Sequence, residues 1–257
     1  MIAVHRVLDS GAGIQVPPGL CALGVMTKAP RAGEVKTRLS PPLTPEEAAS
    51  LNVCFLRDTT TAITGCVSNG GARGIGVYTP VGAENAWAEI LPAHFQLVPQ
   101  RGDAFGERLI AAGEDLLALG FDSFCLIDSD SPTVPQRAYT EAVKRLAQSG
   151  DRMVLGPSDD GGYYLIGLKK MHRPLFERID WSTERVAEQT IARAKEIGLA
   201  VDLLPTWYDV DDRATLGRLC NELLGGTGTV NGYPAPETHA FLARLIAAEG
   251  RQRIWPV

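Results

Sequence analysis

Short apolar runs alternate along the chain with longer segments that have helical character. Continuous apolar runs at 20–26, 123–127 and 163–168 have the length of buried strands. Residues 104–119 repeat apolar side chains every three or four positions, and residues 44–63 open with Thr-Pro-Glu-Glu, a typical helix start. This alternation predicts a mainly parallel β-sheet with helices on both faces.

The remaining expected elements are shorter. Strands are expected near 74–78, 95–98, 153–155 and 201–204, and helices near 84–90, 136–148, 183–197, 212–224 and 239–248. Residues 1–19 are rich in glycine and proline and show no periodicity, so we expect an irregular N-terminal leader. The rest, residues 20–257, is expected to form a single domain.

Composition narrows the possible partners. The chain of 257 residues is 45% hydrophobic and has 25 Lys and Arg against 30 Asp and Glu, a net charge of −5. We therefore expect no surface dedicated to nucleic acid or to an anionic membrane. No apolar stretch has the length of a bilayer span, and the N-terminus lacks the uninterrupted apolar run of a signal peptide. The five cysteines form no Cys-x-x-Cys pair, so we expect reduced thiols and a cytoplasmic protein.

A basic segment follows the first expected strand. Residues 27–40 hold four cations and one anion, so the local charge is +3. Gly33 allows close backbone approach, and Lys36 and Arg38 can donate to phosphate oxygens. The P-loop pattern is not met, because Val35 precedes Lys36. The segment is either a phosphate-binding loop or a solvated basic turn.

Two Asp-x-Asp pairs follow expected strands. Asp128 and Asp130 come after the strand expected at 123–127, and Asp209 and Asp211 lie between the last expected strand and the next helix. Carboxylates at the ends of parallel strands can together hold a hard divalent cation and its phosphate ligands. Each pair also has a simpler explanation, since an aspartate there can cap the following helix.

Consecutive glycines join two expected strands. Asp160 precedes Gly161 and Gly162. The glycines either let the backbone approach a ligand, with Asp160 beside it, or form a tight hairpin turn with Asp160 at its corner. Both interpretations stay open.

Two further polar positions have only local explanations. Asp58 lies among apolar positions of the helix expected at 44–63, so it either points into a polar cleft or pairs with a cation. Ser182 precedes the helix expected at 183–197 and is expected to cap it.

Taken in order, these segments resemble a bacterial family labelled radical-SAM/selenodomain-associated transferase 1. The motifs are Lys28-Ala-Pro-x-x-Gly33-x-Val-Lys36-Thr37-Arg38-Leu39, Asp128-Ser-Asp130-Ser-Pro132, Gly156-Pro-x-x-Asp160-Gly-Gly-Tyr-Tyr-Leu-Ile-Gly167, Trp181-Ser-Thr and Trp207-Tyr-Asp209-Val-Asp211. The resemblance covers about residues 23–219. It implies a GT-A (nucleotide-diphospho-sugar transferase) fold with a mixed, mostly parallel sheet, and kinship with molybdenum-cofactor and phospholactate guanylyltransferases.

The resemblance also implies roles for individual residues. Phosphate binding falls to Lys28, Gly33, Lys36, Thr37 and Arg38, and Mg²⁺ or Mn²⁺ binding to Asp128 or Asp130 together with Asp209 or Asp211. Asp130 corresponds to the usual acid of the family, and Asp128 is an additional one. The expected catalytic residues are Lys36, Asp130 and Asp160, of which Asp160 is the best candidate for a general base.

These features predict a metal-dependent transferase that uses a nucleotide-activated donor. It is expected to be either a glycosyltransferase acting on a nucleotide sugar or a nucleotidyltransferase acting on a nucleotide triphosphate, with a small-molecule acceptor. The local +3 favours nucleotidyl transfer, and the family names favour glycosyl transfer. The alternatives are a catalytically inactive nucleotide-binding module and a phosphate-ester hydrolase. The nucleotide base, the acceptor and the oligomeric state do not follow from the sequence.

Overall fold

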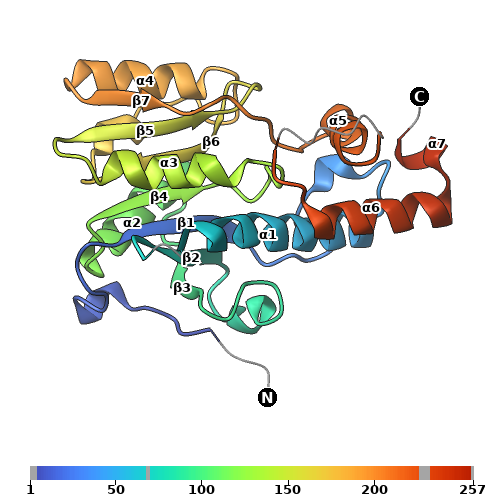
Figure 1. Ribbon diagram of the computed structural model, residues 1–257, viewed down its shortest axis with the longest axis horizontal. Coiled ribbons are helices and arrows are strands. Elements are labelled where there is room, and N and C mark those ends of the chain that lie inside the picture. The colour runs from blue at the N-terminus through green and yellow to red at the C-terminus, as the bar shows by residue number, and fades with distance from the viewer. Residues whose placement is uncertain (1–4, 68–69, 226–231, 256–257) are drawn as a thin grey trace.

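One seven-stranded sheet organises the molecule, for which a computed structural model describes residues 5–67, 70–225 and 232–255 (Figure 1). The strands are β1 (Cys21–Lys28), β2 (Ala72–Thr79), β3 (Gln96–Pro99), β4 (Ser123–Ile127), β5 (Arg152–Pro157), β6 (Tyr163–Leu168) and β7 (Ala200–Leu203). Their order is β3-β2-β1-β4-β6-β5-β7. Only β6 runs antiparallel to its neighbours among the described strands, so the expected mixed, mostly parallel sheet is confirmed.

Helices cover both faces of the sheet. α1 (Pro45–Val67) and α3 (Gln136–Leu146) pack on one face, and α2 (Phe105–Ala118) and α4 (Val186–Glu196) pack on the other. Short 3-10 helices occupy Ser10–Ala12, Thr37–Leu39, Glu84–Trp87 and Arg173–Phe176. No described helix combines the length and the apolar character needed to cross a membrane.

A third core lies beyond one end of the strands. It is built by α5 (Arg213–Leu224), α6 (Pro236–Glu249) and α7 (Arg251–Ile254) against the first half of α1. Figure 1 shows these helices at the right of the molecule, past the tips of the β1 and β4 arrows. The third core therefore stands beside the strand ends at which ligands of parallel sheets bind.

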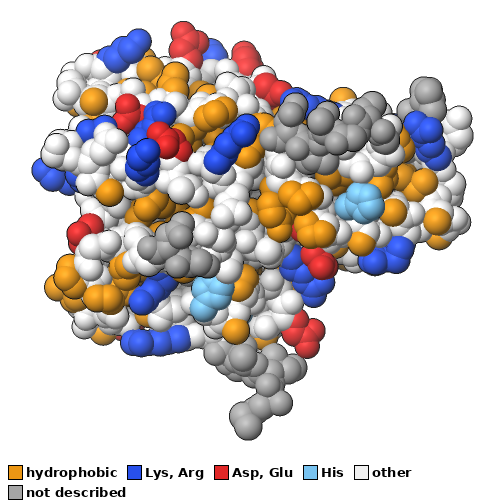
Figure 2. Space-filling view, in the orientation of Figure 1, with side chains coloured by type: hydrophobic (Ala, Val, Ile, Leu, Met, Phe, Trp, Pro, Cys, Tyr) orange, Lys and Arg blue, Asp and Glu red, His pale blue; other side chains and the backbone are white. Residues whose placement is uncertain are grey.

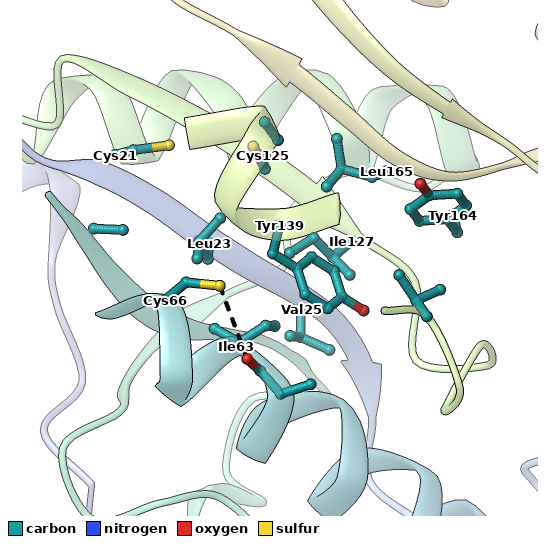
Figure 3. Packing of buried hydrophobic residues seen from close by; sticks show 14 of the residues in the cluster. Cys21, Leu23, Val25, Ile63, Cys66, Cys125, Ile127, Tyr139, Tyr164 and Leu165 are labelled. Atoms are coloured by element: carbon teal, nitrogen blue, oxygen red, sulfur yellow. Dashed lines mark hydrogen bonds between the residues drawn. The ribbon is translucent and has the colours of Figure 1, made fainter. Parts of the chain in front are cut away.

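The central strands are buried on both faces, as their unbroken apolar sequences predict. In β1, Leu23 and Val25 belong to the core under α1 and α3, whereas Ala22 belongs to the opposite core. Figure 3 shows the β1 side chains beside Cys125 of β4. All five cysteines are free and buried, including Cys21 beside Leu23, and they act as small apolar side chains.

The described part of the expected leader packs against the domain. Residues 5–19 contain one helical turn, and the Leu8 backbone N–H donates to the Leu97 carbonyl at the edge of the sheet (2.8 Å). Leu8 and Val16 are buried in the core that faces α2. This segment is thus irregular in conformation and still contributes to the core.

Two local expectations are corrected by the structure. Ser182 does not cap α4, because the helix begins at Val186 and Ser182 has a left-handed backbone (φ 64°). Asp58 forms no ion pair with any described residue, and a capping role takes the place of the two alternatives. It is buried and accepts hydrogen bonds from the backbone N–H groups of Glu237 (3.1 Å) and Thr238 (2.8 Å) at the start of α6. Asp58 therefore caps a helix about 180 residues away in sequence.

Charges on the face in view are mixed. Figure 2 shows Lys and Arg scattered among Asp, Glu and neutral side chains, without a broad basic area on that face among the described residues.

Candidate active site

The segments after β1, β4 and β7 meet at one edge of the sheet. The Val210 backbone N–H donates to the Asp130 carbonyl (3.0 Å) and so joins the two Asp-x-Asp segments. Ser158 forms a bridge with Trp207, which brings the loop between β5 and β6 to the same place. The two Asp-x-Asp segments and the loop that contains Asp160 are therefore neighbours in space.

Lys36 lies at the centre of this meeting point. Its Nζ is 2.8 Å from Asp130 Oδ1 and 2.8 Å from Asp211 Oδ1, and it donates to the Val210 carbonyl (2.8 Å). The side chain is only 5% exposed. Burial acts to lower the pKa of Lys36, but the two carboxylates outweigh it and raise the pKa above its ordinary value. Lys36 therefore stays cationic and holds together the ends of two separate segments.

The basic loop forms a hollow beside Lys36. This basic hollow, about 280 Å³, is lined by Lys28, Glu34, Val35, Lys36, Thr37, Arg38, Asn52, Ser129, Asp130 and Asp211. Arg38 is 71% exposed, and its Nη1 is 3.8 Å from Asp211 Oδ2. Gly33 (φ 76°) shapes the loop but does not line the hollow. Four of the five predicted phosphate-binding residues thus surround one space.

Asp128 differs from Asp130 in having a buried carboxylate oxygen. Ser131 Oγ donates to Asp128 Oδ2 (2.6 Å), and Oδ1 has no hydrogen-bond partner among the described residues. Burial, then the nearby charges of Asp130 and Asp209, raise the pKa of Asp128 well above its ordinary value. The carboxyl groups of Asp128, Asp130 and Asp209 are therefore close enough to repel one another when ionised.

Asp209 experiences the same crowding. Burial, then the charges of Asp211 and Asp160, raise the pKa of Asp209 to about 6. The hydrogen bond from Ser158 Oγ to Asp209 Oδ1 is long (3.5 Å) and therefore weak. An additional positive charge here would relieve the repulsion.

The carboxylates suit a divalent cation by their chemistry. Among the described residues, no three Asp, Glu, His or Cys side chains already form a metal-binding group, and Lys36 lies between Asp130 and Asp211. The donors are nevertheless all oxygens, Asp128 has an unpartnered buried oxygen, and the pKa of Asp209 is raised. Mg²⁺ commonly takes one or two protein carboxylates and fills its other positions with phosphate and water. Two of the four predicted ligands would therefore suffice once phosphates are present.

Asp212 has a separate, structural role. It is the N-cap of α5, where its Oδ1 accepts the Thr215 backbone N–H (2.9 Å). The aspartate that caps the helix after this Asp-x-Asp pair is therefore Asp212, and Asp211 is left to pair with Lys36.

The Asp160 loop is a hairpin turn that also borders a cleft. Gly162 N–H donates to Asp160 Oδ1 (2.8 Å) between the antiparallel strands β5 and β6. Gly161 has a positive φ (92°), and a Cβ there would lie 2.0 Å from the Glu184 carbonyl oxygen. The glycines thus serve the turn and its packing, and Asp160 remains at the edge of the cleft.

That cleft includes aromatic residues to which the sequence assigned no role. The aromatic cleft, about 460 Å³, is lined by Arg38, Phe105, Asp160, Gly162, Tyr163, Trp181, Ser182, Thr183, Glu184, Val186 and Asp211. Phe105 and Trp181 form an edge-to-face pair with ring centres 5.0 Å apart. The motif Trp181-Ser-Thr was a signal for this wall, whereas Phe105 had no signal beyond its place at a helix start.

Comparison by sequence gives a partial family match. A family described as "Uncharacterized protein conserved in bacteria (DUF2064)" matches residues 63–183, which include Asp128, Asp130 and Asp160. No curated protein sequence matches the chain.

Comparison by structure supports the fold. A protein from Desulfovibrio desulfuricans G20, described as a "putative nucleotide-diphospho-sugar transferase", superposes with a TM-score of 0.77 at 28% identity over 92% of this chain and 99% of that one. The inositol-1-phosphate CTP transferase of T. maritima has a TM-score of 0.47 and 14% identity over 79% and 93% of the two chains, and is too distant to carry an argument. The expected GT-A, nucleotide-diphospho-sugar transferase fold is therefore confirmed.

Proposed function

We propose that this chain is a transferase that uses a nucleotide-activated donor and a divalent cation. The observation that carries the proposal is the basic hollow, in which Lys36, Thr37 and Arg38 face the carboxylates of Asp130 and Asp211. Cations and carboxylates side by side suit a metal-bound polyphosphate, because each partner finds opposite charge. The D. desulfuricans protein has the same fold and a related description, which supports the proposal.

The residues have distinct proposed roles. Lys28, Thr37 and Arg38 bind phosphate oxygens, with Arg38 suited to a bidentate contact. Lys36 holds Asp130 and Asp211 in place and offers positive charge to the leaving group. Asp130, with Asp209 or Asp211, would hold Mg²⁺ or Mn²⁺, and Asp128 lies behind them.

A bound cation would supply charge neutralisation on the donor phosphates. The protein's own part is positioning and the exclusion of water, and Asp160 is the proposed general base for the acceptor. In nucleotidyl transfer an acceptor oxygen attacks the α-phosphorus of a nucleotide triphosphate and pyrophosphate leaves. In glycosyl transfer an acceptor attacks the anomeric carbon and a nucleoside diphosphate leaves.

The test is a thermal-shift screen of nucleotide triphosphates and nucleotide sugars, each with and without Mg²⁺ or Mn²⁺. A ligand that binds the native state raises the melting temperature by mass action. We expect one nucleotide class to stabilise the protein only when the metal is present. Asp130→Asn should remove that shift, and Glu188→Gln, an exposed carboxylate on α4, should keep it.

Product analysis separates the remaining alternatives. Release of pyrophosphate identifies nucleotidyl transfer, and release of a nucleoside diphosphate identifies glycosyl transfer. Turnover with water as the sole acceptor would instead indicate a hydrolase, and binding without turnover across all donors would indicate an inactive nucleotide-binding module.

A further inference from the structure

The aromatic cleft and the basic hollow share two residues. Arg38 and Asp211 line both spaces, so the two are adjacent at that point. If the donor phosphates bind at Lys36, then the group attached to them, or the acceptor that attacks them, lies at the mouth of the aromatic cleft. The residues that line the cleft therefore indicate which kind of donor group or acceptor it can bind.

Negative charge prevails in the aromatic cleft. Three carboxylates line it, those of Asp160, Glu184 and Asp211, against the single cation Arg38. Arg38 is 3.8 Å from Asp211, and the neighbouring Arg185 pairs with Asp180 (2.8 Å). Among the described residues neither Asp160 nor Glu184 forms an ion pair, so these two carboxylates repel anions and can accept hydrogen bonds from hydroxyl groups.

The aromatic side chains provide an apolar wall. Phe105 is 49% exposed and lies edge to face with Trp181, so the two rings offer an apolar surface to a ligand in the cleft. Tyr163 lines both this cleft and a smaller cavity of about 140 Å³ beside Asp130. Its hydroxyl is buried and has no hydrogen-bond partner among the described residues.

Backbone contacts hold the walls of the cleft together. The Ala187 N–H donates to the Gly161 carbonyl (2.8 Å), which fixes the hairpin turn to the start of α4. Trp181 packs on Gly106 of α2, where a Cβ would lie 2.9 Å from the indole nitrogen. The cleft is therefore formed in advance of binding, which lowers the entropic cost of association.

We propose that the aromatic cleft binds an uncharged, polyhydroxylated ring, that is, a sugar unit, and discriminates against anionic groups. The C–H face of the ring packs on Phe105 and Trp181, and its hydroxyls donate to Asp160 and Glu184. This inference rests on the proposed function, in which the basic hollow holds the phosphates, and it favours glycosyl transfer over nucleotidyl transfer to a phosphorylated acceptor.

The test uses a pair of probes that differ in one charge. Methyl β-glucoside and methyl β-glucuronide share a ring, and only the second carries a carboxylate. Saturation-transfer NMR on the full chain, with methyl mannoside and methyl galactoside as further neutral probes, should show binding of at least one neutral glycoside. The glucuronide should bind at least tenfold more weakly than the neutral glycoside that binds best. Equal or tighter binding of the glucuronide, or no signal from any neutral glycoside, overturns the proposal.

Variants locate the binding. Phe105→Ala should weaken neutral glycosides several-fold, and Glu184→Gln should reduce the difference between the probes to less than threefold. Val81→Ala, which also shortens an exposed apolar side chain (70% exposed), should change neither. If a nucleotide raises the melting temperature but the protein does not distinguish the neutral glycosides from the glucuronide, this inference alone is refuted. If no nucleotide raises the melting temperature, the proposed function is refuted.

Discussion

Lys36 combines a role that the sequence predicted with one that it could not. Its position in a basic loop predicts a phosphate ligand, and the residue does line the basic hollow. Its contacts to Asp130 and Asp211 depend on a left-handed backbone (φ 49°) and on segments far away in sequence. Local pattern carries no information about such contacts, which is why the sequence assigned those aspartates to a metal and left this ion pair unseen.

The first prediction concerns Lys36→Met. Removal of the ammonium leaves two carboxylates without their cation, so we expect the free energy of unfolding to fall by about 1–3 kcal/mol, less than for a fully buried pair. Nucleotide affinity should fall at least tenfold. Urea unfolding and nucleotide titration measure both effects. Lys28→Met is the control for stability, because loss of the exposed ion pair between Lys28 and Glu34 should change the free energy of unfolding by less than about 1 kcal/mol. Unchanged stability in Lys36→Met would contradict the central role of this ammonium.

The second prediction follows from the raised pKa of Asp209, about 6 against an ordinary 3.8. Between about pH 4 and pH 6 the folded protein keeps a proton that the unfolded chain releases, so the free energy of unfolding falls as pH rises. Above about pH 6 the decrease in the free energy of unfolding is complete and amounts to roughly 2–3 kcal/mol. With a chelator present, Asp209→Asn should therefore be more stable than the parent at pH 7.5 and similar to it at pH 4. Destabilisation at pH 7.5 would refute the assignment, and Glu188→Gln should show no such pH dependence.

At the scale of elements, most boundaries follow from local sequence, and the exceptions have tertiary causes. The expected start at Thr44-Pro45 matches α1 (Pro45–Val67). α4 begins at Val186, three residues late, because the segment before it packs around Gly161 of the hairpin. α7 had no sequence signal, since its four residues are too few to show periodicity.

The third prediction tests the contact between the hairpin turn and α4. In Gly161→Ala the new methyl group would overlap the Glu184 carbonyl and also strain a positive φ, so we expect a loss of roughly 2–4 kcal/mol and weaker glycoside binding. Gly82→Ala separates these causes, since Gly82 has nearly the same φ (90°) with open space around it. It should lose only about 1 kcal/mol. Equal losses in thermal or urea unfolding would show that packing against Glu184 does not matter.

The fourth prediction tests the cap of α6. Asp58→Ala leaves the backbone N–H groups of Glu237 and Thr238 without their acceptor, and we expect a loss of about 1–3 kcal/mol in urea unfolding. Ser50→Ala removes an exposed hydroxyl from α1, the helix that carries Asp58, and should lower the free energy of unfolding by less than about 0.5 kcal/mol. A small effect at Asp58 would mean that other contacts hold α6.

At the scale of the whole molecule, the fold class was predictable but the sheet order was not. Alternating strands and helices predict a parallel sheet with two covered faces, and the family resemblance added the GT-A fold. β6 lies between β4 and β5 and runs antiparallel to both. This position depends on how the β5–β6 hairpin pairs with β4, a contact between segments far apart in sequence. Because β5 runs in the same direction as β1 and β4, the Asp160 turn at its carboxyl end lies at the edge where those strands end, which places the aromatic cleft beside the basic hollow.

The ion pair between Lys36 and Asp211 joins positions 175 residues apart, and the cap by Asp58 spans 180. During synthesis the lysine therefore exists long before its second carboxylate does. Contacts of such separation close large loops. A nascent chain that has not yet reached Asp211 offers a sheet with an unfinished site. Nucleotide binding should thus require a chain that contains both Lys36 and Asp211, and a product that stops before Asp211 should give no signal in a nucleotide-binding assay.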